Sequence, residues 1–276
     1  MGVIAIGEGI ILLSGSMDLS LPAIGGVGGV CLVMTSNVWF PGAPTILLLL
    51  LPLIVGAACG ALNGFYISRT GVHPFLVTLG TLLLFTGLKE IISLKTYLIQ
   101  NDMVKTLGGG SVIQGLSFAT ILVLLVAFLI WVFLNQTHIG MRIYGIGGNA
   151  ASAELTGVNV KNNRLLVHVL GGVLGGLGGL LWVGRQGAYY PSMLGFNTIF
   201  MIFAMAVFGG ISLRGGRGNI EDVVAGIFFI GTLFTGLSFL DVGVYLRYAI
   251  VGSFIIAGVI INSARFEIRD RLLTSA

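Results

Sequence analysis

The stretch LLVHVLGGVLGGLGGLLWVG, residues 165–184, runs for 20 residues without an acidic or basic side chain other than one histidine. A helix of that length rises about 30 Å, which matches the hydrocarbon thickness of a bilayer. Gly171, Gly175 and Gly179 recur at four-residue spacing, so they share one helix face and let a second backbone approach closely. The stretch predicts a membrane-spanning helix in tight contact with another helix.

The rest of the chain has the same character. Of its 276 residues, 56% are hydrophobic and 9% are charged, whereas soluble domains carry about 25% charged residues. We therefore expect an all-α polytopic membrane protein, a single domain over residues 1–276. Its roughly nine candidate spans lie at 1–16, 21–36, 45–67, 74–93, 117–135, 165–184, 198–213, 220–238 and 245–263. The first two are short and rich in glycine, and could form one broken or re-entrant element.

The basic residues predict the orientation. If the loop around residues 148–164 is cytoplasmic, alternation of the spans places nine Lys and Arg residues inside and five outside or near the outer boundary. This bias agrees with the positive-inside rule. We expect cytoplasmic loops near 68–73, 137–164 and 214–221 and a cytoplasmic C-terminus, in a multi-pass protein of the cell (inner) membrane. The same alternation of the spans puts Met1 outside, which suggests that a first helix is missing at the N-terminus.

A polar segment that cannot span the bilayer interrupts the hydrophobic runs: GNAASAELTGVNVKNNR, residues 148–164. Asn149 is a good helix N-cap, and Gly157 can adopt the left-handed conformation that ends a helix. The seven residues between them would rise about 10 Å. The pattern predicts a short surface helix on the cytoplasmic side.

Two acidic residues lie among the apolar runs. Asp18 is followed by Pro22, a pattern that favours an N-cap of a helix beginning near Leu19; the alternative is a functional group at membrane depth. Glu8 has no cationic neighbour in sequence. A role in a transport pathway and a structural hydrogen bond suit it equally.

Several function classes lack support in the sequence. There is no P-loop motif G-x-x-x-x-G-K-[ST], so this chain is not expected to hydrolyse ATP by that route. We expect no catalytic residues, metal site or bound cofactor, because the three histidines form no ligand spacing and no Ser/His/Asp pattern is evident. Cys31 and Cys59 are interpreted as small buried hydrophobes. No basic and aromatic cluster indicates a nucleic-acid partner.

Four motifs, in order, resemble the ribose/xylose-type permeases of ABC sugar importers. SGSMDLSLPAI (14–24) is similar to their G-[GS]-I-D-L-S-V-G stretch, and GALNGFYISRTGVHPFLVTLGTLLLFTGL (60–88) to their G-x-x-N-G…PFI-x-TLGT…RGL segment. THIGMRIYGIGGNAASAELTGVNV (137–160) resembles T-x-x-G-R-x-I-Y-A-x-GGN-x-x-A-A-x-x-SGI-x-V, and FGGISLRGGRGNI (208–220) resembles GGTSL-x-GG-x-G. The resemblance covers nearly the whole chain.

The resemblance implies a fold, partners and a role. Such permeases have about ten spans, pair with a second permease subunit as a homodimer or related heterodimer, and contact membrane lipid. Their partners are an ATP-binding-cassette ATPase subunit, which uses the ATP, and an extracytoplasmic solute-binding protein. The segment 148–160 is similar to the coupling helix that docks on the ATPase. Its residues here are Asn149, Ala150, Ala151, Ser152, Ala153, Glu154, Leu155, Thr156 and Gly157.

Departures from the family pattern concern the charged residues. Glu154 stands where many relatives are basic, and Glu8 where the family has an apolar residue. These differences argue against ribose itself as the solute. The candidate pathway or outer-mouth residues are Glu8, Asp18, Asn63, Tyr189, Tyr190 and Phe196. The three aromatic residues could stack on a sugar or anchor helices at the membrane interface.

The expected function is therefore that of a translocation subunit for a sugar or sugar-like solute, without catalytic activity of its own. The alternative is a self-contained secondary transporter or channel for a small polar solute. That alternative requires charge relays or broken helices inside the membrane, for which Glu8 and Asp18 are the available groups.

Overall fold

The computed structural model describes the backbone of residues 1–274 and the side-chain surroundings of residues 1–258 and 260. Its helices are α1 Gly2–Leu13, α2 Leu21–Met34 with the π-helical turn η1 Thr35–Trp39, α3 Thr45–Thr70, α4 Pro74–Ile92, α5 Asp102–Gly109, α6 Phe118–Gln136, α7 His138–Gly148, α8 Ala150–Leu155, α9 Val160–Gln186, α10 Phe196–Gly209, α11 Ile220–Phe239 and α12 Val244–Thr274. Four short strands, β1 Tyr97–Leu98, β2 Ser111–Ile113, β3 Leu116–Ser117 and β4 Ala188–Tyr189, form the antiparallel pairs β1–β4 and β2–β3.

The prediction of an all-α polytopic membrane protein is confirmed. Every predicted apolar run carries a helix. Six helices of the described part, α2 with η1, α3, α4, α6, α9 and α11, are long and apolar enough to cross a membrane. Three shorter apolar helices, α1, α10 and the described part of α12, make up the remainder of the nine runs.

The glycine face of α9 lies at the centre of the packing, as the spacing predicts. α3 lies along it so closely that a Cβ on Gly176 would overlap the carbonyl oxygen of Pro52, and one on Gly172 that of Gly56. On a second side α2 makes the same kind of contact, because a Cβ on Gly179 would overlap the carbonyl oxygen of Gly25. The two contacts hold α2 and α3 against α9 backbone to backbone.

The N-terminal run is a half-length helix inside the protein. Residues 3–13 of α1 are all buried, and α1 packs against α9, α10 and α11. Its 12 residues rise about 18 Å, less than the bilayer thickness. The chain then leaves helical geometry for Ser14–Ser20 before α2 begins. The first two runs are therefore separated by a break, and the second, α2 with η1, is long enough to span a membrane by itself.

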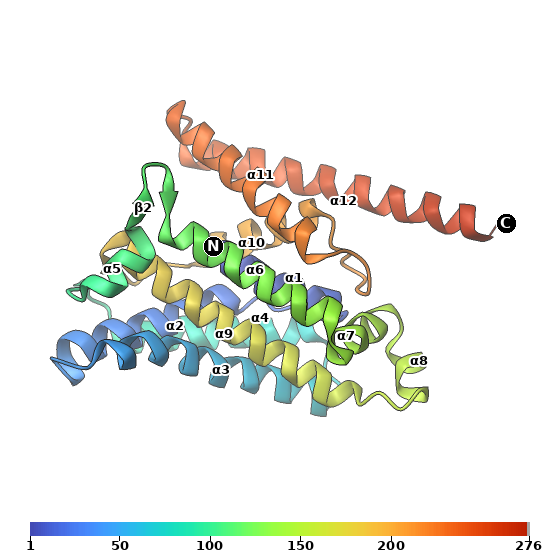
Figure 1. Cartoon of the computed structure of the whole chain (residues 1–276), viewed down its shortest axis with the longest axis horizontal. Helices are drawn as coiled ribbons and strands as arrows, with labels where there is room; N and C mark the ends of the chain where they lie inside the picture. Colours follow the sequence, from blue (N-terminus) through green and yellow to red (C-terminus); the bar gives the residue numbers. More distant parts are fainter. Residues whose placement is uncertain (275–276) are drawn as a thin grey trace.

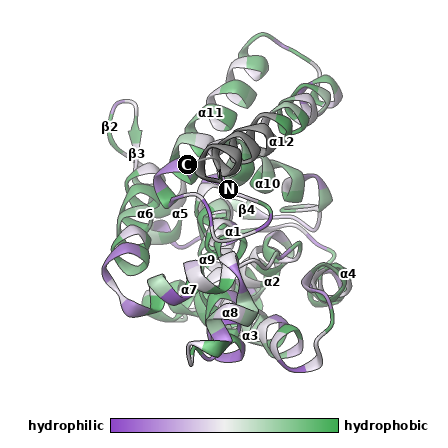
Figure 2. Ribbon diagram, turned by 90° about the vertical axis from the view of Figure 1, so that its right-hand side faces the viewer, coloured by the Kyte–Doolittle hydropathy of each residue, from purple (hydrophilic) through white to green (hydrophobic). Residues whose placement is uncertain are grey.

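The two ends of the molecule differ. Figure 1 shows α7 and α8 at one end, toward which α12 runs, and α5 with the β2–β3 hairpin at the other. Seen from the α8 end in Figure 2, hydrophilic residues gather on and around α7 and α8, over a body that is mostly hydrophobic. This arrangement agrees with loops 68–73, 137–164 and 214–221 sharing one side.

The contact between α3 and α9 predicts a stability difference between two glycines. Gly176→Ala should lower the free energy of unfolding by about 1–3 kcal/mol, because the methyl group forces the two backbones apart. The matched control is Gly231→Ala in α11, where a Cβ meets nothing within 4 Å. It should leave stability unchanged or raise it by up to about 1 kcal/mol. Thermal unfolding in detergent, followed by tryptophan fluorescence, measures both; equal shifts would contradict this packing.

Candidate functional site

The break between α1 and α2 places irregular backbone at membrane depth, where unpaired N–H groups are costly. Its first residues bond back to the last turn of α1: the amide of Gly15 donates to the carbonyl of Leu12 at 2.9 Å. The next amides use acidic side chains. The amide of Asp18 donates to Glu8 Oε1 at 3.3 Å, and that of Ser20 donates to Asp18 Oδ1 at 2.8 Å. Two carboxyl groups therefore complete the hydrogen bonding of the break.

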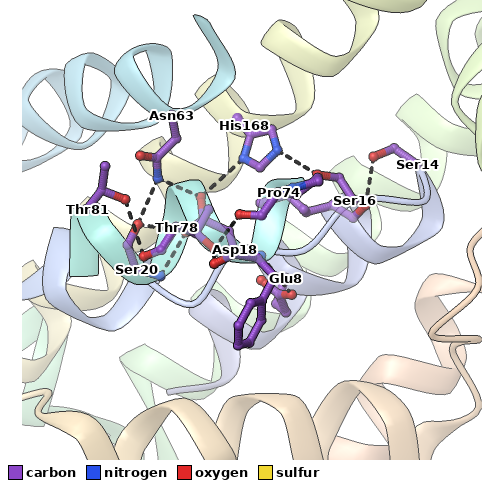
Figure 3. A network of polar contacts seen from close by, with 12 residues as sticks. Glu8, Ser14, Ser16, Asp18, Ser20, Asn63, Pro74, Thr78, Thr81 and His168 are labelled. Carbon is purple, nitrogen blue, oxygen red and sulfur yellow. Dashed lines mark hydrogen bonds and ion pairs between the residues drawn. The ribbon is translucent and has the colours of Figure 1, made fainter. Parts of the chain in front are cut away.

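Asp18 is the centre of a buried polar network (Figure 3). Oδ1 also accepts from the hydroxyl of Ser20 at 2.6 Å. Oδ2 accepts from Asn63 Nδ2 at 2.9 Å and pairs with His168 Nδ1 at 3.1 Å. Asn63 belongs to α3 and His168 to α9, and all of these side chains are buried. We name Glu8, Ser16, Asp18, Ser20, Asn63 and His168 the Asp18 network.

The prediction that Asp18 caps a helix beginning near Leu19 is wrong. α2 begins at Leu21, its N-cap is Ser20, and no side chain caps it. The Asp18 carboxylate instead accepts from the amide two residues later, which is the bond of an Asx turn. A helix N-cap and an Asx turn both place an acidic residue just before a helix, so the two look alike in sequence. Here the lone pairs of Asp18 are used by Ser20, Asn63 and His168, so none is available to the first turn of α2.

His168 links Asp18 to a serine, an arrangement that no spacing in the sequence indicated. Its Nε2 lies 2.9 Å from Ser16 Oγ, while Nδ1 contacts Asp18. A carboxylate only accepts hydrogen bonds, so we assign the Nδ1 proton to this contact. The order Ser–His–Asp is that of a hydrolase triad. However, all three side chains are buried, so a substrate could not reach Ser16 Oγ without separating the helices, and the contacts serve to join α9 to the break.

Glu8 makes the structural hydrogen bond that was one of its two predicted roles. Its side chain is fully buried in α1, and Oε1 accepts from the amide of Asp18. Within the described part of the chain, Glu8 Oε2 and Asn63 Oδ1 have no hydrogen-bond partner. The network thus brings together three of the six predicted pathway or outer-mouth residues, Glu8, Asp18 and Asn63.

The Asp18 network lies near the end of the protein that carries α8. His168 is eight residues into α9 and Asn63 is seven residues before the end of α3. At about 1.5 Å per residue, the network lies roughly 10–12 Å from those helix ends. It is therefore inside the membrane-spanning region but close to one surface.

The caps predicted for the short surface helix are confirmed. Asn149 is the N-cap of α8, and its Oδ1 accepts from the amide of Ser152 at 3.0 Å. Gly157 has φ +84°, and its amide donates to the carbonyl of Glu154 at 3.0 Å. Leu155 is 91% exposed. A shallow groove beside the helix is lined by His138, Met141, Arg142, Gly145, Asn149, Ser152, Ala153, Thr156 and Val158.

Glycines connect the α8 region to the break. The amide of Gly216 donates to the carbonyl of Leu13, the last residue of α1, at 2.9 Å. At Gly15 a Cβ would lie 3.3 Å from the Cα of Gly147, at the end of α7. α7 runs directly into α8. A displacement of α8 would therefore also shift the backbone contacts that α7 makes with the break.

The aromatic residues of the predicted outer mouth lie apart from the Asp18 network and differ among themselves. Tyr189 is fully buried: it pairs with Tyr97 in the β1–β4 ladder, and its hydroxyl donates to the carbonyl of Lys89 at 3.4 Å. Burial is the main cause that raises the pKa of Tyr189 to about 12. The ring of Tyr189 faces no solvent in this structure, and its stacking on a solute stays a prediction. Tyr190 is partly buried and Phe196 is 60% exposed, and their roles stay predictions.

Sequence reasoning missed three of the residues that the structure emphasises. Ser16 and His168 carry no signal of their own, because their contact joins positions 152 residues apart. Lys89 is one of the five basic residues that the orientation placed outside or near the outer boundary, and its side chain is buried. A basic residue inside an apolar run was the one available signal for it.

Comparison with known proteins places these features in a family. Residues 1–261 match the family described as branched-chain amino acid transport system / permease component. The chain is 36% identical to the D-allose transport system permease protein of Escherichia coli K12, over 94% of this chain and 79% of that protein. It is 32% identical to the galactose/methyl galactoside import permease protein of Salmonella typhimurium (96% and 83%) and 31% identical to the ribose import permease protein of Bacillus subtilis (95% and 80%). No solved structure matches.

The Asp18 network predicts a large loss of stability when its centre is removed. Asp18→Ala should lower the free energy of unfolding by about 2–6 kcal/mol, because it leaves the buried donors of His168 and Asn63 unsatisfied, each at a cost of about 1–3 kcal/mol. Asp18→Asn keeps the shape of the side chain, and its free energy of unfolding should lie between those of Asp18→Ala and the wild type. The control is Asp102→Ala on α5, whose side chain is 94% exposed and whose loss should not move the Tm. Equal Tm values for all three variants would contradict the network's role.

Proposed function

Because the chain belongs to the family of branched-chain amino acid transport system permease components, we propose how this permease is driven and what it carries. The chain is a membrane-spanning translocation subunit related to the permeases of sugar ABC importers. The observation that carries this conclusion is the match over residues 1–261, together with relatives that import D-allose, galactose or ribose. Nothing observed favours a self-contained secondary transporter or channel.

The solute of this chain, in our proposal, is a sugar or sugar-like molecule delivered by an extracytoplasmic binding protein. A second permease subunit, a copy of this chain or a related one, would complete the pathway. ATP would be hydrolysed by a separate ATP-binding-cassette subunit and not by this chain. The absence of a P-loop from the sequence supports this division of labour.

α8 is proposed as the contact with the ATPase. A six-residue helix has little stability of its own, so its two caps are what keep it ordered. Leu155 projects from it into solvent, and the groove beside it is framed by α7 residues such as Met141 and Arg142. In this proposal the exposed apolar side chains of Leu155 and Met141 contact the ATPase.

Force applied to α8 would reach the membrane interior in two steps. α7 ends against the break through Gly147 and Gly15, and the break is tied to α3 and α9 through Asp18. A displacement of α8 would therefore bias the position of Ser14–Ser20 relative to those two helices. In this proposal the break is the element that changes between the two states of the transport cycle.

The proposed orientation places α8 and the C-terminus in the cytoplasm. A cysteine at the exposed position Lys161 should react with a membrane-impermeant maleimide only in inverted vesicles, and one at the exposed position Gln186 only in intact cells. These two residues lie at opposite ends of α9. Labelling of position 161 in intact cells would reverse the topology.

The coupling role of α8 predicts the effects of changes at Gly157. Gly157→Val places a β-branched residue at φ +84°, a conformation that costs such residues energy, whereas Gly157→Asn is tolerated there. A Cβ at this position meets nothing within 4 Å, so the difference between the variants is conformational. The Val variant should insert normally in the membrane and lose its ATPase on purification, while the Asn variant should retain it.

Glu154→Arg reverses an exposed charge on the same helix. If Glu154 faces a basic or hydrogen-bonding residue of the ATPase, a like-charge contact costs several kcal/mol, and the retained ATPase should fall sharply. Glu154→Gln is the matched control, and the amount of ATPase retained should fall less than with Glu154→Arg. Full ATPase retention by both Gly157→Val and Glu154→Arg would overturn the assignment of α8.

A further inference from the structure

The turn between β4 and α10, residues 190–195, which we name the outer turn, lies at the end of α9 opposite α8. It has two different faces. Ser192 is exposed, whereas Met193 and Leu194 are buried. One face of the turn is therefore open to the surroundings while the other packs into the protein.

The buried face is seated on glycines of α2. A Cβ on Gly29 would lie 3.0 Å from Met193 Cε, and one on Gly25 would lie 2.9 Å from Leu194 Cδ1. Gly29 precedes Trp39, the end of η1, by ten residues, or roughly 15 Å of helix. The outer turn therefore reaches well below the end of the neighbouring helix and fills space between α2 and α9.

A buried lysine from a third helix holds the turn in this position. Lys89 of α4 is 1% exposed, and its Nζ donates to the backbone carbonyl of Met193 at 2.9 Å. Its side chain lies on Gly26 of α2, where a Cβ would be 3.0 Å from Lys89 Cδ. No ion pair with a carboxylate is found for Lys89 in the described residues. Because a buried amine is costly without a hydrogen bond, this position of Lys89 depends on the turn.

The backbone of the turn is held in an unfavourable conformation. Leu194 has φ +50°, one of two non-glycine residues with positive φ in the described part of the chain. Such a residue persists where its surroundings impose the conformation, and these residues cluster at clamps and switch regions. Release of the turn would allow Leu194 to return to an ordinary conformation.

We propose that the outer turn closes the translocation pathway on the side opposite α8, and that Lys89, as a positioning residue, holds it closed through the Met193 carbonyl. When the turn lifts, the amine of Lys89 loses this acceptor and faces the opened space. Hydroxyl oxygens of an entering sugar then accept its hydrogen bonds in place of the carbonyl. This inference rests on the proposed import function, and the contact itself is tested without transport.

The test is the accessibility of a cysteine at position 193 in the membrane-embedded protein. Met193→Cys keeps the backbone carbonyl and should react slowly with a membrane-impermeant maleimide. Adding Lys89→Met, which removes the donor at similar length, should accelerate the reaction about tenfold, the effect expected for the loss of one buried hydrogen bond. Lys89→Gln keeps a donor and should give a smaller increase. Ser192→Cys, already exposed, should react quickly with or without Lys89→Met.

The controls separate the proposal from general loosening and from the import function. Lys95→Met changes an exposed lysine and should not alter the rate at position 193. If Lys89→Met does not insert in the membrane, Gly26→Ala displaces the Lys89 stem from α2 and should raise the rate in its place. An unchanged rate in Lys89→Met, or in Gly26→Ala if the former fails to insert, overturns the proposal. Wild-type protein that imports none of the sugars D-allose, D-galactose and D-ribose would count against the import function, while the labelling result would still decide the Lys89 contact.

Discussion

A chain that interrupts its helices inside a bilayer must satisfy the freed backbone groups with its own atoms, because lipid offers no hydrogen bonds. This protein meets the same need of buried backbone groups at two places, with side chains of opposite kind. At the break after α1, the amides of Asp18 and Ser20 have no helical partner, and the carboxyl groups of Glu8 and Asp18 accept from them. At the outer turn the buried carbonyl of Met193 accepts from the amine of Lys89. The sparse charged residues inside the protein are explained by this requirement.

The local features of the sequence were sufficient for much of the fold. Hydrophobic runs and glycine spacing predicted the helices and the close packing of α9, because both depend on periodicity within one segment. The caps of α8 were predictable for the same reason, since Asn149 bonds an amide three residues away. The break between the first two runs was visible as short length and high glycine content.

The candidate site could be predicted only in part, because its contacts join distant segments. Asp18 was singled out as unusual, but its partners Asn63 and His168 lie 45 and 150 residues away, so a local cap was the nearest interpretation. Tyr189 was expected at the surface because its segment is polar and aromatic. Its burial depends on β1, a two-residue strand too short for any pattern to indicate. The contact of Lys89 could not be predicted either, because its acceptor is a backbone carbonyl, a group that every residue type carries.

The seam between α3 and α9 has a mechanical consequence. Where Gly56, Gly172 and Gly176 meet, there are no side chains that could change rotamer to accommodate sliding. Backbone contact therefore makes α3 and α9, with α2 on the other face, behave as one rigid unit. In the proposed transport cycle, relative motion would therefore fall to the surfaces where larger side chains interdigitate. One such surface is the aromatic cluster of Phe208, Phe229 and Phe254 that joins α10, α11 and α12. The glycines thus set apart a rigid part of the subunit, against which the break and these aromatic surfaces would shift in the proposed transport cycle.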